Sequence, residues 1–168
     1  MPNRLRGSGA GPRLAPEVLA VNPLMRELYQ ETIMGHNRAP RNFRVMEGAD
    51  GQARGNNPLC GDSLDVYVRL DGEELADVAF HGDGCAISRA SASMMTDAVK
   101  GRTRDEARAM YEEFHKLVTG EGEPDMQQLG KMKVFAGVKE FPARVKCAAL
   151  AWRTLVAALE QEREVSTE

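Results

Sequence analysis

Apolar and polar residues alternate in two short segments of the first half of the chain. In residues 64–70 every second position is Leu or Val, and residues 75–81 repeat the pattern around Val78. A period of two residues is typical of a half-buried β-strand. Asp71-Gly72 is a turn sequence, so the two segments are predicted to form an antiparallel β-hairpin.

Helical periodicity marks four other segments, in which apolar residues recur at intervals of three and four. Asn22 suits a helix N-cap and Pro23 the first helical position. Thr103 and Glu106 form a capping box, and Pro142 suits the first turn of the last helix. The predicted helices cover residues 22–35, 85–100, 103–120 and 142–159.

Turn-forming residues predict loops between these elements. Residues 36–42 surround Pro40, residues 47–57 are polar and Gly-rich without either period, and residues 82–84 separate the second strand from the next helix. Residues 120–133 are acidic and then mixed, and they are predicted to hold at most one helical turn.

The order of the elements predicts an α+β fold, because the strands come early and most helices follow. We expect a small antiparallel β-sheet of about three strands packed against helices. Residues 23–162 are predicted to form a single domain. Residues 1–22 are basic and rich in Gly and Pro, and they are predicted to be a disordered tail.

Composition and charge narrow the classes of partner. A chain of 168 residues with 42% apolar residues is long enough for one compact domain. The 22 basic and 25 acidic residues give a net charge of −3 without long blocks of one sign, which argues against a nucleic-acid partner. No apolar run approaches the roughly 20 residues needed to span a membrane. We therefore expect a cytoplasmic protein.

The three cysteines are the candidate chemistry. Cys60 and Asp62 directly precede the first strand, and the hairpin should bring them beside residues 81–85 and therefore beside Cys85. Cys147 falls within the first two turns of the last helix. Three cysteines in a chain of this class favour a metal site or a reactive thiol over a disulfide.

Helix N-termini should favour the thiolate form of two of these cysteines, Cys85 and Cys147. Arg144, three residues before Cys147, adds positive charge on nearly the same helix face. Three thiolates and the carboxylate of Asp62 make a four-ligand set that suits Zn²⁺, and an iron–sulfur cluster could use the same set. An oxygen ligand among sulfurs suggests a site that exchanges ligands.

Simpler interpretations remain open at this point. Scattered cysteines are often small buried apolar residues, and the chain has no Cys-x-x-Cys pair. Asp62 could cap a turn, and Arg144 could be a solvated residue of the first helical turn. Of the three histidines, His81 alone is predicted to lie near enough to serve as a spare ligand.

Four motifs together resemble the IscU/NifU-like family of iron–sulfur cluster assembly proteins, over roughly residues 24–160. The motifs are Gly35-His36 with Pro40-Arg41-Asn42, Asn57-Pro58-Leu59-Cys60-Gly61-Asp62, Gly82-Asp83-Gly84-Cys85-Ala86-Ile87-Ser88 and Arg144-Val145-Lys146-Cys147.

Within this family the chain is similar to the SufU branch. Lys146 stands where scaffolds of the IscU type carry a histidine, and the chaperone-binding sequence Leu-Pro-Pro-Val-Lys of those scaffolds is absent. Residues 120–139 resemble the insertion of the SufU type. Both departures argue against a scaffold.

The resemblance implies a SufE/IscU-like fold and a zinc-dependent sulfurtransferase, with the metal held by Cys60, Asp62, Cys85 and Cys147. It implies that Cys60 accepts persulfide sulfur from a SufS-type cysteine desulfurase and passes it to a downstream SUF scaffold or other sulfur acceptor. In the family scheme a histidine of the desulfurase takes over part of the zinc coordination and frees the cysteine. We assign Arg144 a role in sulfur acceptance. The alternatives are a scaffold that binds a [2Fe-2S] cluster and a structural zinc module without chemistry.

Overall fold

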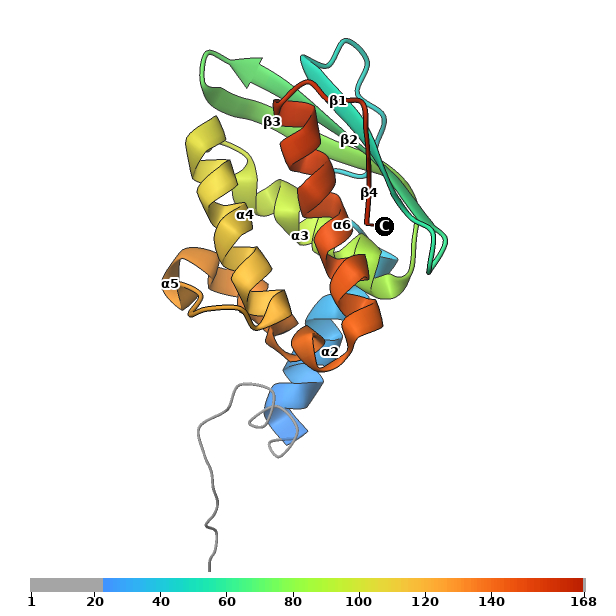
Figure 1. Ribbon diagram of the computed structural model, residues 1–168, viewed down its shortest axis with the longest axis vertical. Coiled ribbons are helices and arrows are strands. Elements are labelled where there is room, and N and C mark those ends of the chain that lie inside the picture. The colour runs from blue at the N-terminus through green and yellow to red at the C-terminus, as the bar shows by residue number, and fades with distance from the viewer. Residues whose placement is uncertain (1–22, 168) are drawn as a thin grey trace, which may run out of the picture.

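The computed structural model describes residues 23–167, which form a four-stranded sheet and a set of helices (Figure 1). The strands are β1 (Gly51–Asn57), β2 (Asp62–Asp71), β3 (Glu74–Asp83) and β4 (Glu164–Ser166). The helices are α2 (Pro23–Arg38), α3 (Ala86–Val99), α4 (Arg104–Thr119), α5 (Met126–Leu129), the 3₁₀ helix η2 (Gly130–Glu140) and α6 (Pro142–Leu159). The predicted α+β class is therefore confirmed.

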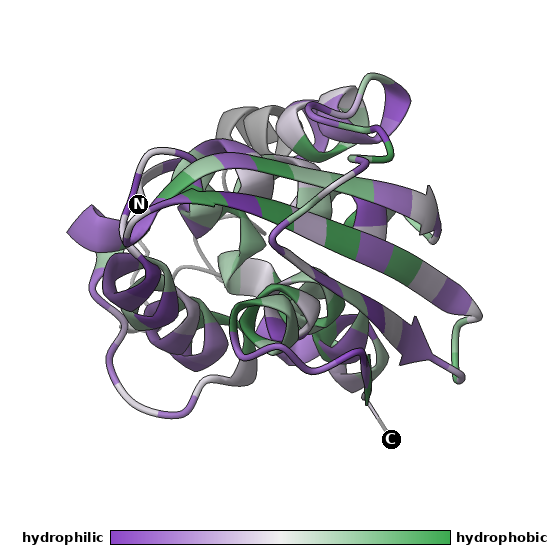
Figure 2. Ribbon diagram, turned by 90° about the horizontal axis from the view of Figure 1, so that it is seen from above, coloured by the Kyte–Doolittle hydropathy of each residue, from purple (hydrophilic) through white to green (hydrophobic). Residues whose placement is uncertain are grey.

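The predicted hairpin is confirmed as β2 and β3, which pair antiparallel with Val66 opposite Phe80. Gly72 turns the chain between them at a φ of 64°, in the left-handed region that favours glycine. The leucine and valine face of β2 is buried against α6, and α3 packs on β3. Figure 2 shows the resulting alternation of hydrophilic and hydrophobic residues along the strands.

Strand β1 corrects one prediction, because residues 51–57 form a strand and not a loop. The inward positions of β1 carry Gly51, Ala53 and Gly55, which are buried against α6. A Cβ atom on Gly55 would lie 1.9 Å from Oγ1 of Thr154. Helix α6 approaches β1 so closely that only very small residues fit at these three positions. The sequence of β1 therefore lacks the alternation of large apolar and polar residues that predicts a strand.

Strand β4 also corrects the prediction, which gave about three strands and an antiparallel sheet. The sheet order is β3-β2-β1-β4, and β4 pairs parallel with β1 through residues that follow position 162. This strand has three residues, which is too short for a recognisable period in the sequence.

Two further boundaries differ from the prediction. Helix α2 continues past Gly35 to Arg38, so His36 lies in its last turn and not in a loop. Gly82 and Asp83 belong to β3, because they pair with Leu64 and Ser63 of β2. The predicted N-cap Asn22 and the predicted tail lie outside the described residues.

The predicted helices α3, α4 and α6 are confirmed. The capping box of Thr103 and Glu106 is present at the start of α4, and Pro142 occupies the first turn of α6. Behind the sheet, α4 packs on α6 and η2. There the Phe114 ring stacks on Trp152 at 5.1 Å and meets Phe135 edge to face at 5.6 Å. This rigid helical layer supports α6, which carries Cys147.

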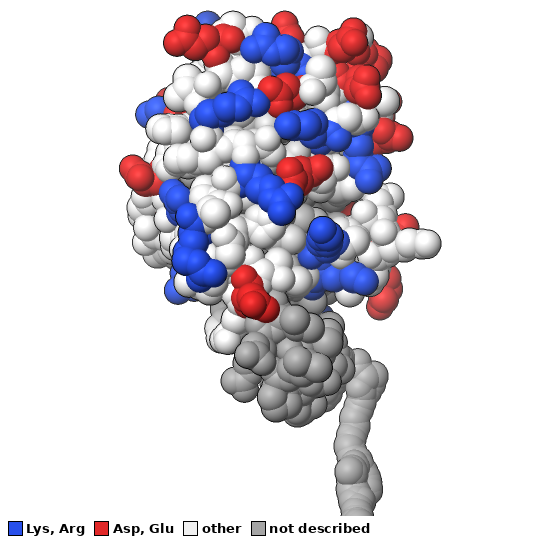
Figure 3. Space-filling model, turned by 180° about the vertical axis from the view of Figure 1, so that it is seen from behind, with Lys and Arg blue, Asp and Glu red and all other residues white. Residues whose placement is uncertain are grey.

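The surface has no broad field of one charge on the face seen from behind, where basic and acidic side chains are interspersed (Figure 3). None of the helices in the described part of the chain is long and apolar enough to cross a membrane.

Candidate metal centre

Four elements meet where the chemistry-bearing residues gather. Cys60 lies in the turn between β1 and β2, and Asp62 is the first residue of β2. Cys85 is the N-cap of α3, and Cys147 lies in the second turn of α6. The sheet, α3 and α6 therefore each supply at least one candidate ligand. Because these elements pack on one core, the core fixes the positions of the ligands relative to one another.

Three of the four predicted ligands form a compact group. One ligand atom from each of Cys60, Asp62 and Cys147 lies within 4.8 Å of the other two. The sulfurs of Cys60 and Cys147 are 3.2 Å apart. Asp62 and Cys147 are buried, whereas Cys60 is exposed. The group therefore opens to solvent on the Cys60 side.

Cys85 adjoins this group without belonging to its closest three members. Its backbone N–H donates to Oδ1 of Asp62 at 2.9 Å, as the hairpin geometry predicts. A hydrogen bond with Cys147 lowers the pKa of Cys85 to about 6, while the same bond and burial raise the pKa of Cys147. Without a metal, Cys85 therefore loses its proton more readily than Cys147.

The buried side chain of Asn57 connects two of the candidate ligands. Its Nδ2 donates to Oδ2 of Asp62 at 3.2 Å and to the sulfur of Cys147 at 3.6 Å. Its Oδ1 accepts from Oγ1 of Thr167 at 3.0 Å. Sequence reasoning missed this role. A buried asparagine at an inward strand position would have been the signal, but β1 itself was not recognised.

Ser88 and Gly84 lie beside the buried carboxylate of Asp62. The Ser88 hydroxyl is fully buried and has no hydrogen-bond partner among the described residues. A Cβ atom on Gly84 would lie 2.9 Å from this hydroxyl and 3.3 Å from Oδ1 of Asp62. An unsatisfied buried hydroxyl beside a buried carboxylate is expected at a site that binds a charged group.

Arg144 lies at the exposed rim of the same site. Its pKa is raised first by the charge of Cys85 and then by a hydrogen bond with Cys147. Together with Phe141 and Ile87 it borders an open cavity of about 500 Å³ that reaches Cys85. The guanidinium group therefore faces the thiols at their solvent-accessible side.

The histidines lie elsewhere. His81, the predicted spare ligand, is exposed and stacks on Phe43 with the ring centres 4.8 Å apart. It is not part of the group formed by Cys60, Asp62 and Cys147. His115 lies on α4, where its ring meets Tyr111.

The donor set fits a thiophilic divalent ion. Two sulfurs and one carboxylate oxygen are close enough to share one ion. Cys85, the fourth predicted ligand, lies beside them, with its backbone N–H bonded to Asp62. Mixed sulfur and oxygen ligands suit Zn²⁺, and an iron–sulfur cluster is also bound through thiolates. The geometry alone therefore fits either a zinc ion or an iron–sulfur cluster.

Comparison with known proteins gives a consistent result. The family model described as the NifU-like N-terminal domain matches residues 28–159. A protein named iron-sulfur cluster assembly scaffold protein IscU, from Streptococcus pyogenes serotype M1, is 39% identical over 137 residues, which cover 82% of this chain and 86% of that protein. The zinc-dependent sulfurtransferase SufU of Bacillus subtilis is 39% identical over 144 residues, covering 86% and 97%.

Solved structures agree. A protein of Fervidobacterium islandicum, described as an iron-sulfur cluster assembly scaffold for the SUF system, superposes with a TM-score of 0.75 at 37% identity, covering 80% of this chain and 98% of that one. A NifU-like N-terminal domain from Brucella abortus has a TM-score of 0.74 at 24% identity, covering 82% and 96%, which shows the fold alone.

The resemblance expected from the motifs is thus confirmed. Because the family model matches residues 28–159 and two relatives at 39% identity align with more than four-fifths of the chain, the protein belongs to the NifU-like N-terminal domain family.

Proposed function

We propose that the protein is a zinc-dependent sulfur acceptor and carrier in iron–sulfur cluster biogenesis, with Cys60 as the accepting residue. The observation that carries this proposal is the unequal exposure of the thiols. Cys60 is exposed, Cys85 is half-buried and Cys147 is buried. A second protein can therefore reach the sulfur of Cys60, while the other ligands remain fixed in the helical layer.

The transfer needs a persulfide donor, which we propose to be a SufS-type cysteine desulfurase. The Cys60 thiolate attacks the outer sulfur of the donor persulfide and forms a new S–S bond. The S–S bond of the donor breaks, and its electron pair leaves with the donor cysteine as a thiolate. The exchange needs neither oxidant nor reductant. A downstream SUF scaffold or another thiol then takes the sulfur from Cys60 by the same exchange.

The charges at the rim favour this chemistry. Arg144 faces the thiols from the exposed side, and its positive charge stabilises a thiolate at Cys60 or Cys85. Positive charge at this position also stabilises the persulfide anion that forms on Cys60. We therefore assign Arg144 a supporting role in sulfur acceptance.

Cys60, Asp62, Cys85 and Cys147 would hold the zinc ion. When bound, the ion keeps its thiolate ligands deprotonated at neutral pH. Asn57 and the backbone N–H of Cys85 orient Asp62 for this role through their hydrogen bonds. The exposed position of Cys60 makes it the donor that can be released with least disturbance of the fold.

A scaffold that binds an iron–sulfur cluster is the second candidate function. It is supported by the same thiolate set and by the relative of 39% identity that is named as an IscU scaffold. The residue before Cys147 argues for the first candidate, because Lys146 stands where scaffolds of the IscU type carry a histidine that could serve as a metal ligand.

Metal analysis and desulfurase assays test the choice. Protein purified without oxygen should contain about one zinc per chain, and adding it should stimulate a SufS-type desulfurase. The variant Cys60→Ala should abolish stimulation and keep the fold. A stable cluster that reaches an apo-acceptor would favour the scaffold, and stimulation unchanged in Cys60→Ala would favour a structural zinc module.

A further inference from the structure

A second cavity lies at the other end of α3 from the metal centre. Its residues Asp97 and Ala98 are in the last turn of the helix, roughly 18 Å along the helix axis from Cys85. The cavity has a volume of about 340 Å³, which is within the range of small-molecule sites. Segments of α2, α4, α5 and η2 form its other walls.

The floor of this cavity is apolar and rich in methionine. Four buried side chains, one from each of four helices, form it: Met94, Met110, Leu129 and Met132. Methionine side chains are flexible and polarisable, so they adapt to flat or branched apolar groups. The floor would therefore accept an aromatic or aliphatic body and would not select its shape closely.

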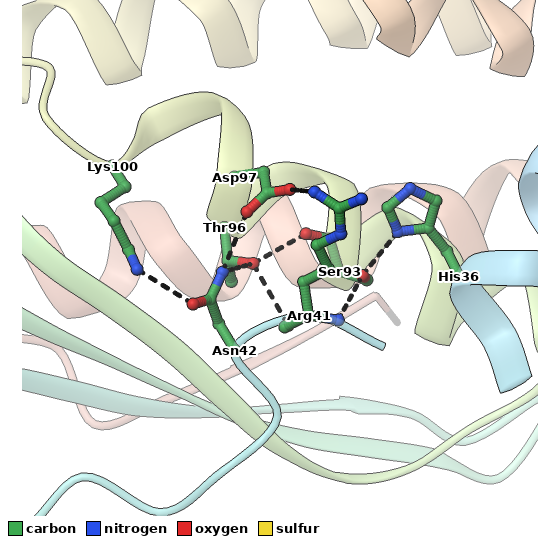
Figure 4. A network of polar contacts seen from close by, with 7 residues as sticks. All are labelled: His36, Arg41, Asn42, Ser93, Thr96, Asp97 and Lys100. Atoms are coloured by element: carbon green, nitrogen blue, oxygen red, sulfur yellow. Dashed lines mark hydrogen bonds and ion pairs between the residues drawn. The ribbon is translucent and has the colours of Figure 1, made fainter. Parts of the chain in front are cut away.

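The mouth of the cavity is positively charged. Arg41, Arg102 and Lys131 are exposed there, and Asp97 is the one acidic residue among the described residues that line it. Asp97 is already engaged, because it pairs with Arg41 at 2.7 Å and accepts from Asn42 at 3.2 Å (Figure 4). Arg102 donates through Nε to the carbonyl oxygen of Ala98 at 2.9 Å, and no carboxylate of the described residues pairs with Arg102 or Lys131, so neither positive charge is compensated by an ion pair.

His36 forms part of the cavity wall and is held there by a hydrogen bond with Ser93 of α3. Its Nδ1 lies 2.7 Å from the Ser93 hydroxyl, which also accepts the backbone N–H of Arg41 at 2.8 Å (Figure 4). Burial lowers the pKa of His36, the nearby charges of Arg41 and Lys131 lower it further, and the charge of Asp97 acts in the opposite direction. The hydrogen bonds hold the imidazole ring in place, so the wall is built before a ligand arrives.

We infer that this cavity is a binding site for a small organic anion with an apolar body, such as an aromatic or branched aliphatic carboxylate, sulfonate or phosphate ester. The apolar body lies on the methionine floor, and the anionic group meets Lys131 and Arg102 at the mouth. None of the candidate metal ligands lines the cavity, so the site is separate from the sulfur-accepting centre.

Three probes of similar shape and different charge test this inference with the full-length protein. Naphthalene-2-sulfonate, 2-naphthalenemethanol and 2-naphthylmethylammonium share one ring system and differ in charge. Calorimetry should show that the sulfonate binds at least about tenfold more tightly than the alcohol, with the ammonium weakest, because attraction to two cations adds to burial of the ring. Amide shifts in NMR spectra should change at Ala98, Leu129 and Gly130.

Two variants and one control complete the test. Lys131→Glu should weaken sulfonate binding by about tenfold or more, and Ala98→Leu should weaken the binding of all three probes because the larger side chain takes up cavity volume. Lys139→Glu, which changes an exposed lysine of the same 3₁₀ helix that does not line the cavity, should stay within about twofold of the parent protein. Equal binding of sulfonate and alcohol, insensitivity to both variants, shifts confined to other residues, or no binding at millimolar concentration would overturn the inference.

Discussion

At the scale of single residues, Asn57 and Asp62 determine how the site is held. Asn57 is fully buried and donates to both Asp62 and Cys147, so it joins the start of β2 to α6. Asp62 in turn accepts the backbone N–H of Cys85 and joins β2 to α3. The side chains of Asn57 and Asp62 thus link β2, α3 and α6, the elements around the three cysteines.

We predict that Asn57→Ala destabilises the protein by about 1–3 kcal/mol, because the partners of a buried amide lose their hydrogen bonds. Chemical denaturation of the metal-free protein measures this change in the free energy of unfolding. Thr167→Val is the milder companion variant, since it removes only the partly buried hydrogen bond to Oδ1 of Asn57. If Asn57→Ala were no less stable than Thr167→Val, the amide would have no organising role.

Asp62→Ala should weaken zinc binding by about tenfold or more, because one donor and its charge are lost. Competition with a chromophoric chelator measures the affinity. Asp83→Ala is the matched control, since Asp83 is an exposed carboxylate at the end of β3, opposite Ser63. Equal zinc affinity in the two variants would leave Asp62 as a structural residue of the turn.

At the scale of elements, strand β1 packs directly against helix α6. Gly51 and Gly55 allow it, and a Cβ atom on Gly51 would lie 2.5 Å from the carbonyl oxygen of Ala158. This contact positions Asn57 at the end of β1 and Cys147 at the start of α6. The geometry of the metal centre therefore depends on two glycines distant from it.

Gly55→Ala should destabilise the protein by about 1–3 kcal/mol, because the new methyl group overlaps Thr154. Gly35→Ala is the matched control: it lies inside α2 with no atom within 4 Å of its Cβ position. It should raise the free energy of unfolding slightly, since alanine is a better helix former than glycine. Thermal unfolding of both variants decides the point, and equal melting temperatures would contradict the close packing.

The same elements show what the sequence can and cannot predict. The hairpin and helices α3, α4 and α6 follow from apolar periodicity and caps, and they suffice to bring Asp62 beside Cys85. Strand β1 was missed because its buried face consists of Gly and Ala, whose placement depends on the distant residues Leu150 and Thr154. The role of Asn57 was hidden with the strand. Tertiary contacts of this kind leave no local pattern.

At the scale of the whole molecule, stability should depend on pH through His36. Its pKa in the folded protein is lowered from an ordinary value near 6.5 by burial and by the charges of Arg41 and Lys131, while Asp97 acts in the opposite direction. The unfolded chain therefore binds more protons than the folded one just below pH 6.5. The free energy of unfolding is therefore highest above pH 6.5 as far as His36 is concerned. It decreases as the pH falls toward the pKa of His36 in the folded protein.

We predict that this decrease is smaller in His36→Gln, which cannot take up a proton in this range. The free energy of unfolding of both proteins, measured by denaturant titration between pH 5 and 8, tests it. Metal-free protein is used, so that protonation of the thiolates does not contribute through metal release. Parallel curves for the two proteins would show that His36 does not supply the dependence.

The whole molecule also combines an exposed thiol with two more protected ones, and the central claim is that Cys60 accepts sulfur. The most direct measurement is mass-spectrometric mapping of persulfides after incubation with a SufS-type desulfurase and cysteine. The account predicts one added sulfur on the peptide that contains Cys60, with the peptides of Cys85 and Cys147 unmodified. Persulfide on Cys85 or Cys147 with none on Cys60, or no persulfide while the desulfurase turns over, would contradict it.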